Sequence, residues 1–164
     1  MRILIVDDEI ECADSLVIAL KPAKFELQSE TDPLKALELY KKTRFDVVIT
    51  DVRMPNMNGI ELLKAIRKFD EKARVIVITA YGELETSIAA INNRAVAFFG
   101  KPVNFGELVA LLNDIQKDIL NDNKLLEDIE RLDSENKRLK ALYSDLVMFL
   151  HKHTHYPLLK DGKN

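Results

Sequence analysis

Five polar residues end or directly follow short apolar runs, and their side chains could act together in one site. They are Asp7, Asp8, Asp51, Thr79 and Lys101. Clustered carboxylates repel one another, so their ionisation is costly unless a cation joins them. Two or three carboxylates with open water positions suit Mg²⁺ better than a softer metal. Such a set could transfer a phosphoryl group: a carboxylate attacks, the metal and the lysine neutralise the phosphoryl oxygens, and the threonine hydroxyl donates a hydrogen bond.

Each of these residues also has an ordinary explanation when it is considered alone. An aspartate after a strand often caps a helix, Thr79 could simply fill a strand, and Lys101 could be a solvated surface lysine. Two adjacent acids together with Asp51 exceed what capping requires. Lys101 stands between an apolar run and a proline, which would hold it near the other groups. The combination therefore favours a functional site.

The segments around these residues predict an α/β fold. Short runs rich in Ile, Val and Phe alternate with stretches whose apolar residues recur every three or four positions. Strands are expected at residues 3–6, 25–28, 46–50, 74–79 and 95–99. Helices are expected at residues 14–20, 33–40, 59–69 and 84–91. This order predicts a doubly wound, flavodoxin-like sheet of five parallel strands, with the polar residues meeting in a crevice at the strands' carboxyl ends.

Four sequence elements occur in order along this framework. They are the acidic pair Asp7-Asp8, the segment DVRMPNMNG at residues 51–59, the pair Thr79-Ala80, and FFGKP at residues 98–102. Each element alone is weak, but their joint occurrence at the ends of the expected strands is specific. Residues 1–119 thereby resemble the receiver domain of two-component response regulators.

The resemblance implies roles for the acidic residues. Asp51 would accept a phosphoryl group from the phosphohistidine of a sensor histidine kinase. Asp8, Asp51 and the backbone carbonyl of Arg53 would bind Mg²⁺ as the cofactor, with Asp7 assisting. The chain would then be a phosphoacceptor signalling protein, limited to self-phosphotransfer and self-dephosphorylation, rather than an enzyme with a separate substrate.

The resemblance also implies a conformational switch. Lys101 would pair with the acceptor, Thr79 would move toward the phosphoryl group, and Phe98 would change rotamer as the switch aromatic. Phe99 is adjacent and points the other way, so only the spacing to Lys101 selects Phe98. The Lys101–Pro102 peptide bond is expected to be cis.

Arg53 and Tyr81 stand two residues after Asp51 and Thr79, respectively. In similar proteins these positions tune how fast the aspartyl phosphate is lost. A bulky pair could shield the phosphate from water, which predicts slow self-dephosphorylation.

Two other functions are compatible with parts of the sequence. An aspartate-nucleophile phosphatase would share the metal, acceptor, threonine and lysine, but it requires a second carboxylate two residues after the nucleophile, where Arg53 stands. A coiled-coil scaffold with a silent receiver is the other alternative. The intact set of Asp8, Asp51, Thr79 and Lys101 argues against it.

The composition limits the partners. The 164 residues include 24 Lys and Arg against 27 Asp and Glu, so a net charge of -3 provides no general attraction for nucleic acid or anionic membranes. The first residues do not resemble a signal peptide, and no apolar stretch approaches the ~20 residues needed to span a bilayer. The single cysteine, Cys12, cannot form an internal disulfide. We therefore expect a cytoplasmic protein that binds neither nucleic acid nor membrane directly.

One long helix is expected from residue 107 to 150, because this stretch contains no proline, glycine pair or strand-like run. A first apolar stripe, expected to pack on the chain's own sheet, comprises Leu108, Leu112, Ile115 and Ile119. The phase slips by three residues near 121–123. Such a slip either overwinds a coiled coil or marks where the stripe that contacts one partner ends and a stripe that contacts another begins, and we favour the second explanation. The second stripe predicts the seam of a homodimeric coiled coil, formed by Leu125, Ile129, Leu132, Asn136, Leu139, Tyr143, Leu146 and Leu150.

The expected organisation is a receiver domain at 1–119, a coiled-coil dimerisation or linker helix at 120–151 and a frayed tail at 152–164. Asn136 falls on an a position, where a buried asparagine pairs best with its twin in a parallel dimer. In that arrangement Glu135 would attract Lys140 of the partner, whereas Asp128 would repel Asp133. The flanking charges therefore support parallel pairing only weakly.

The apolar surface broadens after Leu139, where Leu142, Val147, Met148 and Phe149 lie outside the seam. Such an excess usually covers a further partner surface. Receivers followed by such helices resemble sigma-54-dependent activators and diguanylate cyclase regulators, in which the helix leads to an output domain. About a dozen residues follow Leu150, so the output domain is either missing from this chain or replaced by dimer contacts.

His151, His153 and His155 alternate near the end of the chain. They would converge on one metal ion only in an extended segment, because no helix brings all three together. A frayed terminal segment is the simpler explanation.

Overall fold

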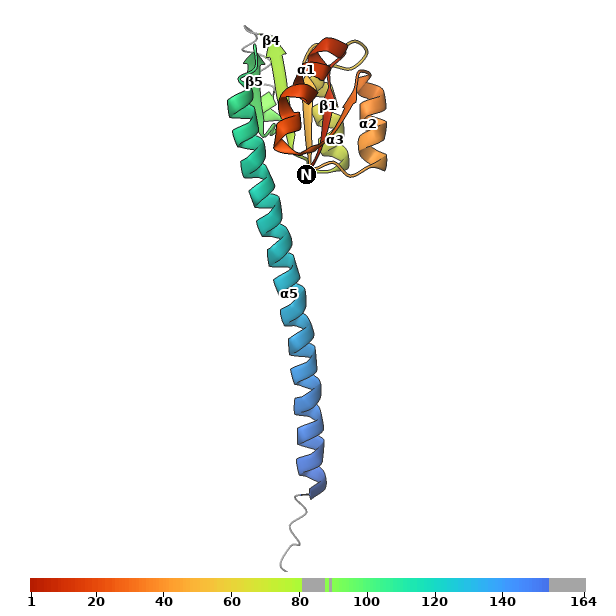
Figure 1. The fold of residues 1–164 in the computed structure, drawn as a ribbon. Helices are drawn as coiled ribbons and strands as arrows, with labels where there is room; N and C mark the ends of the chain where they lie inside the picture. The colour runs from red at the N-terminus through yellow and green to blue at the C-terminus, as the bar shows by residue number, and fades with distance from the viewer. Residues whose placement is uncertain (81–87, 89, 154–164) are drawn as a thin grey trace, which may run out of the picture. The chain divides into compact units, whose positions relative to one another are not determined.

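A five-stranded parallel sheet forms the centre of the compact N-terminal unit, Met1–Gln116 (Figure 1). The computed structural model describes residues 1–80, 88 and 90–153. The strand order is β2-β1-β3-β4-β5, which is the doubly wound order expected from the sequence. The strands are β1 (Arg2–Val6), β2 (Glu26–Glu30), β3 (Val47–Asp51), β4 (Val75–Ala80) and β5 (Ala97–Lys101).

The helices begin where the sequence provides capping residues. Asp32 accepts a hydrogen bond from the N–H of Leu34 (2.9 Å) at the start of α2. Asn58 and Glu61 form a reciprocal capping box at the start of α3. The helical segments are α1 (Ile10–Leu20), the short 3₁₀ helix η1 (Lys21–Ala23), α2 (Pro33–Lys42), α3 (Gly59–Phe69) and α5 (Phe105–His153).

The two faces of the sheet bury different residues of the same strand, because side chains alternate along a strand. Leu4 and Val6 of β1 belong to a core cluster with buried residues of α2 and α3. Ile3 and Ile5 face the other way and are fully or almost fully buried as well. Burial on both faces explains the continuous apolar runs from which the strands were predicted.

Strand β5 starts two residues later than the sequence indicates. Arg94 has a left-handed backbone (φ 59°), and its N–H donates to the carbonyl of Ile91, so a turn directly precedes the predicted strand, and residues 95 and 96 lead from it into β5. Strand β5 also ends two residues later than predicted, so Lys101 is its last residue instead of lying beyond its end. The helix expected at 84–91 lies largely outside the described residues, although residues 90–92 are helical.

Helix α5 begins at a cap formed by Asn104, whose side-chain oxygen accepts from the N–H of Gly106 (3.1 Å). Leu108, Leu112 and Ile115 are buried, as expected of the first apolar stripe. The chain divides into a compact unit at Met1–Gln116 and a second unit that begins at Lys117, so α5 belongs to both. The helix is continuous through 121–123, where the apolar phase slips. Within the described chain, none of the helices is both long and apolar enough to span a membrane.

Candidate phosphoacceptor site

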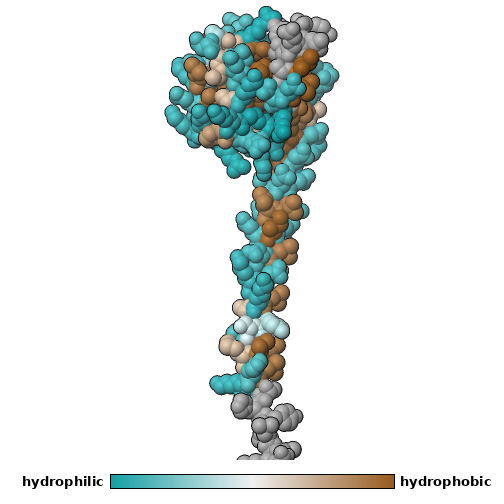
Figure 2. Space-filling model, turned by 180° about the vertical axis from the view of Figure 1, so that it is seen from behind, coloured by the Kyte–Doolittle hydropathy of each residue, from teal (hydrophilic) through white to brown (hydrophobic). Residues whose placement is uncertain are grey.

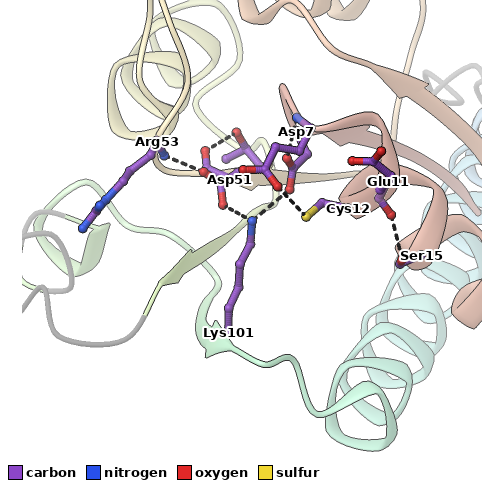
Figure 3. A network of polar contacts seen from close by, with 9 residues as sticks. Asp7, Glu11, Cys12, Ser15, Asp51, Arg53 and Lys101 are labelled. Atoms are coloured by element: carbon purple, nitrogen blue, oxygen red, sulfur yellow. Dashed lines mark hydrogen bonds and ion pairs between the residues drawn. The ribbon is translucent and has the colours of Figure 1, made fainter.

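Asp51 is the last residue of β3 and lies almost fully buried at the carboxyl end of the sheet, with 6% of its surface exposed. One carboxylate oxygen, Oδ2, accepts a hydrogen bond from the N–H of Arg53 (2.5 Å). The other, Oδ1, forms an ion pair with Nζ of Lys101 (2.6 Å). Both oxygens of this carboxylate are therefore oriented, one by the backbone just after β3 and the other by the last residue of β5 (Figure 3).

Lys101 connects Asp51 to a second buried carboxylate. Its Nζ also donates to Oδ2 of Asp7 (3.1 Å), which is 2% exposed and directly follows β1. Burial raises the pKa of Asp7 above its ordinary value of 3.8, against the opposing effects of the Glu9 N–H and of Lys101. Partial burial alone would lower the pKa of Lys101, but hydrogen bonds and charge from Asp51 and Asp7 outweigh it and raise this pKa. Lys101 therefore stays charged between the two acids.

The backbone around Asp51 is held by Gly59 at the start of α3. A Cβ atom on Gly59 would lie 2.0 Å from the carbonyl oxygen of Asp51, a separation that no side chain tolerates. The N–H of Gly59 also donates to the carbonyl of Val52 (2.9 Å). In the sequence, Gly59 is the last residue of the 51–59 segment and the first residue of an expected helix. The 51–59 spacing was the available signal, but the close approach itself depends on tertiary packing.

Thr79 lies in β4 with 2% of its surface exposed. Within the described part of the chain, its hydroxyl oxygen Oγ1 has no hydrogen-bond partner. Buried hydroxyls are rarely left in this state, because burial without a hydrogen bond is costly. The register places Asp51 beside Ile78, one residue before Thr79, so this unused donor belongs to the same edge of the sheet as the acceptor.

The remaining predicted residues occupy different positions. Asp8 is exposed and has no interaction among those described here. The Arg53 side chain extends away from Asp51 in Figure 3. Phe98 is half-buried in β5 and packs against the core cluster. Tyr81 lies outside the described residues. The Lys101–Pro102 bond is cis, which confirms that expectation.

The structure places no three His, Cys, Asp or Glu side chains as a metal-ligand group within its described residues. The groups present nevertheless fit Mg²⁺. Asp7 and Asp51 are two nearly buried carboxylates that share the single ammonium group of Lys101, which leaves one negative charge uncompensated. Their oxygens, together with the neighbouring Asp8, are the hard ligands that this ion prefers.

The eight predicted seam residues all lie on α5 and are exposed in this single chain. The helix continues through His153, so His151 and His153 are helical, and the Nδ1 atom of each approaches the carbonyl four residues earlier. His155 lies outside the described residues.

Comparison with known proteins identifies the compact unit. The family model of the response regulator receiver domain matches residues 3–113. Response regulator protein PilR of Pseudomonas aeruginosa is 37% identical over 132 residues, covering 76% of this chain and 30% of PilR. Chemotaxis protein CheY of Thermotoga maritima is 38% identical over 117 residues, covering 71% of this chain and 98% of CheY. This chain thus spans nearly all of CheY but about a third or less of PilR. The same holds for two further relatives, transcriptional regulatory protein ZraR of Klebsiella oxytoca and regulatory protein AtoC of Escherichia coli, of which it spans 25% and 23%.

Solved structures show the same relationship. A receiver domain protein from Clostridium thermocellum superposes with a TM-score of 0.68 at 29% identity, covering 76% of this chain and 98% of that one. Response regulator TrrA of Thermotoga maritima, in complex with Mg²⁺ and BeF, superposes with a TM-score of 0.64 at 30% identity, covering 70% and 97%. The chain belongs to the response regulator receiver domain family of two-component systems, whose members accept phosphate from histidine kinases and bind Mg²⁺ at the phosphorylation site.

Proposed function

We propose that Asp51 is the residue of this chain that accepts the phosphoryl group. A carboxylate oxygen of Asp51 would attack the phosphorus of a phosphohistidine, the P–N bond would break, and the leaving imidazole would take up a proton. The observation that carries this proposal is the ion-pair cluster in which Lys101 Nζ lies 2.6 Å from Asp51 and 3.1 Å from Asp7. It places one fixed cation beside the carboxylate with which the phosphoryl group would react.

The other groups at the sheet edge have matching roles. Lys101 would neutralise one phosphoryl oxygen and keep the Asp51 carboxylate oriented. Thr79 would donate its unpaired hydroxyl hydrogen to another phosphoryl oxygen, which gives this buried donor an acceptor. Asp8, Asp51 and the Arg53 carbonyl would hold Mg²⁺ with help from Asp7. Mg²⁺, when bound, supplies further neutralisation of charge on the phosphoryl oxygens.

Arg53 separates this function from that of an aspartate-nucleophile phosphatase. Such an enzyme requires a carboxylate two residues after the nucleophile to protonate the leaving group. Arg53 occupies that position and cannot act as such an acid. We therefore propose storage of the phosphoryl group rather than turnover, with slow self-dephosphorylation. Because the Arg53 side chain extends away from Asp51 here, shielding by this residue would need a change of its rotamer.

The output of the switch is assigned to α5. We propose that two chains pair through the exposed seam of α5, and that phosphorylation alters this dimer through Thr79, Phe98 and β5. The dimer would control an output domain or a partner outside this chain. Support comes from the length of the helix, which ends 37 residues after the receiver unit, at His153, and from the apolar seam that it exposes.

Light scattering with Mg²⁺ and beryllium fluoride tests both parts. The mimic should change the mass or shape of the wild-type assembly, and Asp51→Asn should abolish the response while the far-UV spectrum stays the same. An unchanged monomer in both states would exclude the dimer switch. A response that persists in Asp51→Asn would place the acceptor elsewhere.

A further inference from the structure

The apolar seam of α5 has a narrow part in which charged residues flank it closely. Its a positions include Ile129 and Asn136, its d positions include Leu132 and Leu139, and all four are exposed in the single chain. Figure 2 shows patches of apolar side chains along this part of the helix. A seam of this width matches one partner helix, because wider apolar faces are needed to contact two. A second copy of the chain can occupy it in two orientations, parallel or antiparallel.

Asn136 distinguishes these two orientations. Its side chain makes no hydrogen bond among the residues that the structure describes, so the amide is available to a partner. In a parallel, in-register pair, Asn136 meets its twin, and the two amides can bond to each other. In the antiparallel register that pairs the whole seam, Asn136 faces Leu139 and loses any polar partner. A buried unpaired amide costs more than an exposed ion pair gains, so this residue outweighs the flanking charges.

The structure also weakens the main objection to parallel pairing, which is repulsion between Asp128 and Asp133 of the partner. Within one helix Asp128 pairs with Arg131 (3.0 Å), and Asp133 pairs with Lys137 (2.6 Å). Each acid therefore has a basic partner on its own chain, which weakens its repulsion of the acid on the partner helix. These intrahelical contacts cannot be deduced from the heptad pattern alone.

The attractive pair remains available. Glu135 and Lys140 form no ion pair within the described residues. In a parallel dimer, Glu135 of each helix would face Lys140 of the partner helix. The antiparallel alternative would instead rely on Asp133 and Lys140, but Asp133 is already occupied by Lys137. In the heptad pattern alone, the flanking charges support the parallel orientation only weakly. They favour it more clearly once the intrahelical pairs are taken into account.

One feature favours the opposite orientation. Residues 117–135 carry seven acidic and three basic side chains, whereas residues 136–153 carry one acidic and four basic side chains. Antiparallel pairing would place the acidic half of one helix beside the basic half of the other. Many of these charges, however, occupy outward heptad positions, where salt screens them within about 8 Å at physiological ionic strength. Their effect is therefore weaker than that of a buried asparagine.

We propose that α5 pairs with α5 of a second copy in parallel and in register, with Asn136 opposite Asn136 and Glu135 opposite Lys140. This inference rests on the dimer proposed above and specifies its interface. Parallel pairing brings the broad apolar surfaces after Leu139 together at one end of the coil. Any output domain or partner would then meet two copies of this surface at once.

Disulfide trapping tests the orientation in the full chain with Cys12→Ser, so that only introduced cysteines can react. Ile129→Cys and Leu146→Cys are made separately, and one chain carries a mass tag. In the parallel dimer each variant should cross-link to itself, because like positions face each other within disulfide range. A mixture should give no cross-link between the two variants, because these positions are about 25 Å apart along the helix.

The outcomes separate the inference from the dimer on which it rests. Cross-links only between Ile129→Cys and Leu146→Cys would show antiparallel pairing and overturn the inference while the dimer stands. A dimer by light scattering without any cross-link would place the interface elsewhere. A monomer by light scattering would overturn both proposals. As a second variant, Asn136→Leu should give a more heat-stable coil that also yields cross-links between the two cysteine variants, or larger assemblies. An unchanged pattern of cross-links would show that Asn136 does not set the orientation.

Discussion

The receiver unit and the helix beyond Lys117 differ in how their charged residues are paired. In the receiver unit, Asp7, Asp51 and Lys101 come from three distant parts of the chain and meet in a largely buried site. In the helix, the pairs Asp128–Arg131 and Asp133–Lys137 join near neighbours on an exposed surface. Buried charges interact strongly and depend on the whole fold, whereas exposed helical pairs contribute little and form locally. Substitutions of charged residues should therefore have larger effects in the buried site than on the exposed helix.

The largest effect is expected at the acceptor itself. Asp51→Asn removes the only attacking carboxylate proposed for phosphotransfer, so incorporation of phosphate from a small-molecule phosphodonor with Mg²⁺ should fall to background, on the order of a hundredfold or more. Asp14→Asn on the exposed surface of α1 is the matched control and should leave incorporation unchanged. Labelling that persisted in Asp51→Asn would remove this residue from its proposed role.

The next effect concerns the backbone that holds the site. Gly59→Ala places a Cβ 2.0 Å from the Asp51 carbonyl, and overpacking of this kind typically costs about 1–3 kcal/mol. Urea unfolding should show the loss in the free energy of unfolding. Gly106→Ala is the control, because its Cβ would lie 3.3 Å from a side-chain oxygen of Asn104 in the first turn of α5. The control should stay within about 1 kcal/mol of wild type, and equal losses in both variants would refute the close-approach argument.

A smaller effect is expected at Asp7, where burial raises the pKa above the ordinary value of 3.8. The folded state therefore holds this proton more tightly than the unfolded state, so ionisation of Asp7 lowers stability once the pH rises above 3.8. Asp7→Asn should therefore raise the free energy of unfolding at pH 7 above that of the wild type. The gain should shrink below pH 4. A gain that stayed constant with pH would contradict this electrostatic origin.

The smallest effect is expected in the helix. Glu135→Lys and Lys140→Glu each create like-charged pairs in a parallel homodimer, at about 0.5 kcal/mol per exposed pair. A mixture of the two variants should prefer the heterodimer, because both flanking pairs become attractive again. Native mass spectrometry at low salt measures the proportions. Statistical mixing at low salt would indicate that these residues do not face each other.

Much of the fold could be predicted from local pattern. The strands β1 and β3 and the helix α3 follow continuous apolar runs and a capping box, which depend on neighbouring residues alone. The start of β5 was predicted two residues early, because the left-handed turn at Arg94 has no sequence marker such as glycine. The identities of the candidate site residues followed from their positions at strand ends.

The contacts among those residues could not be predicted in the same way. The sequence analysis named Asp8 as a metal ligand and Asp7 only as an assisting acid, but in the structure it is Asp7 that is buried and contacts Lys101. The lack of a partner for Thr79 Oγ1 among the described residues likewise depends on packing from several elements. In the helix, the seam was evident from its spacing, whereas the rotamers that pair Asp128 and Asp133 within their own chain were not.

Local pattern in the residues is enough to predict the succession of strands and helices along the chain, the edge of the sheet that carries the polar residues, and the apolar phase of α5. These properties depend on periods of two and 3.6 residues and on local capping. Packing between distant segments determines which acid shares Lys101 with Asp51, and it requires glycine at residue 59. The physical reason is that both depend on distances between residues far apart in the chain, which are established only when β1, β3, α3 and β5 pack together.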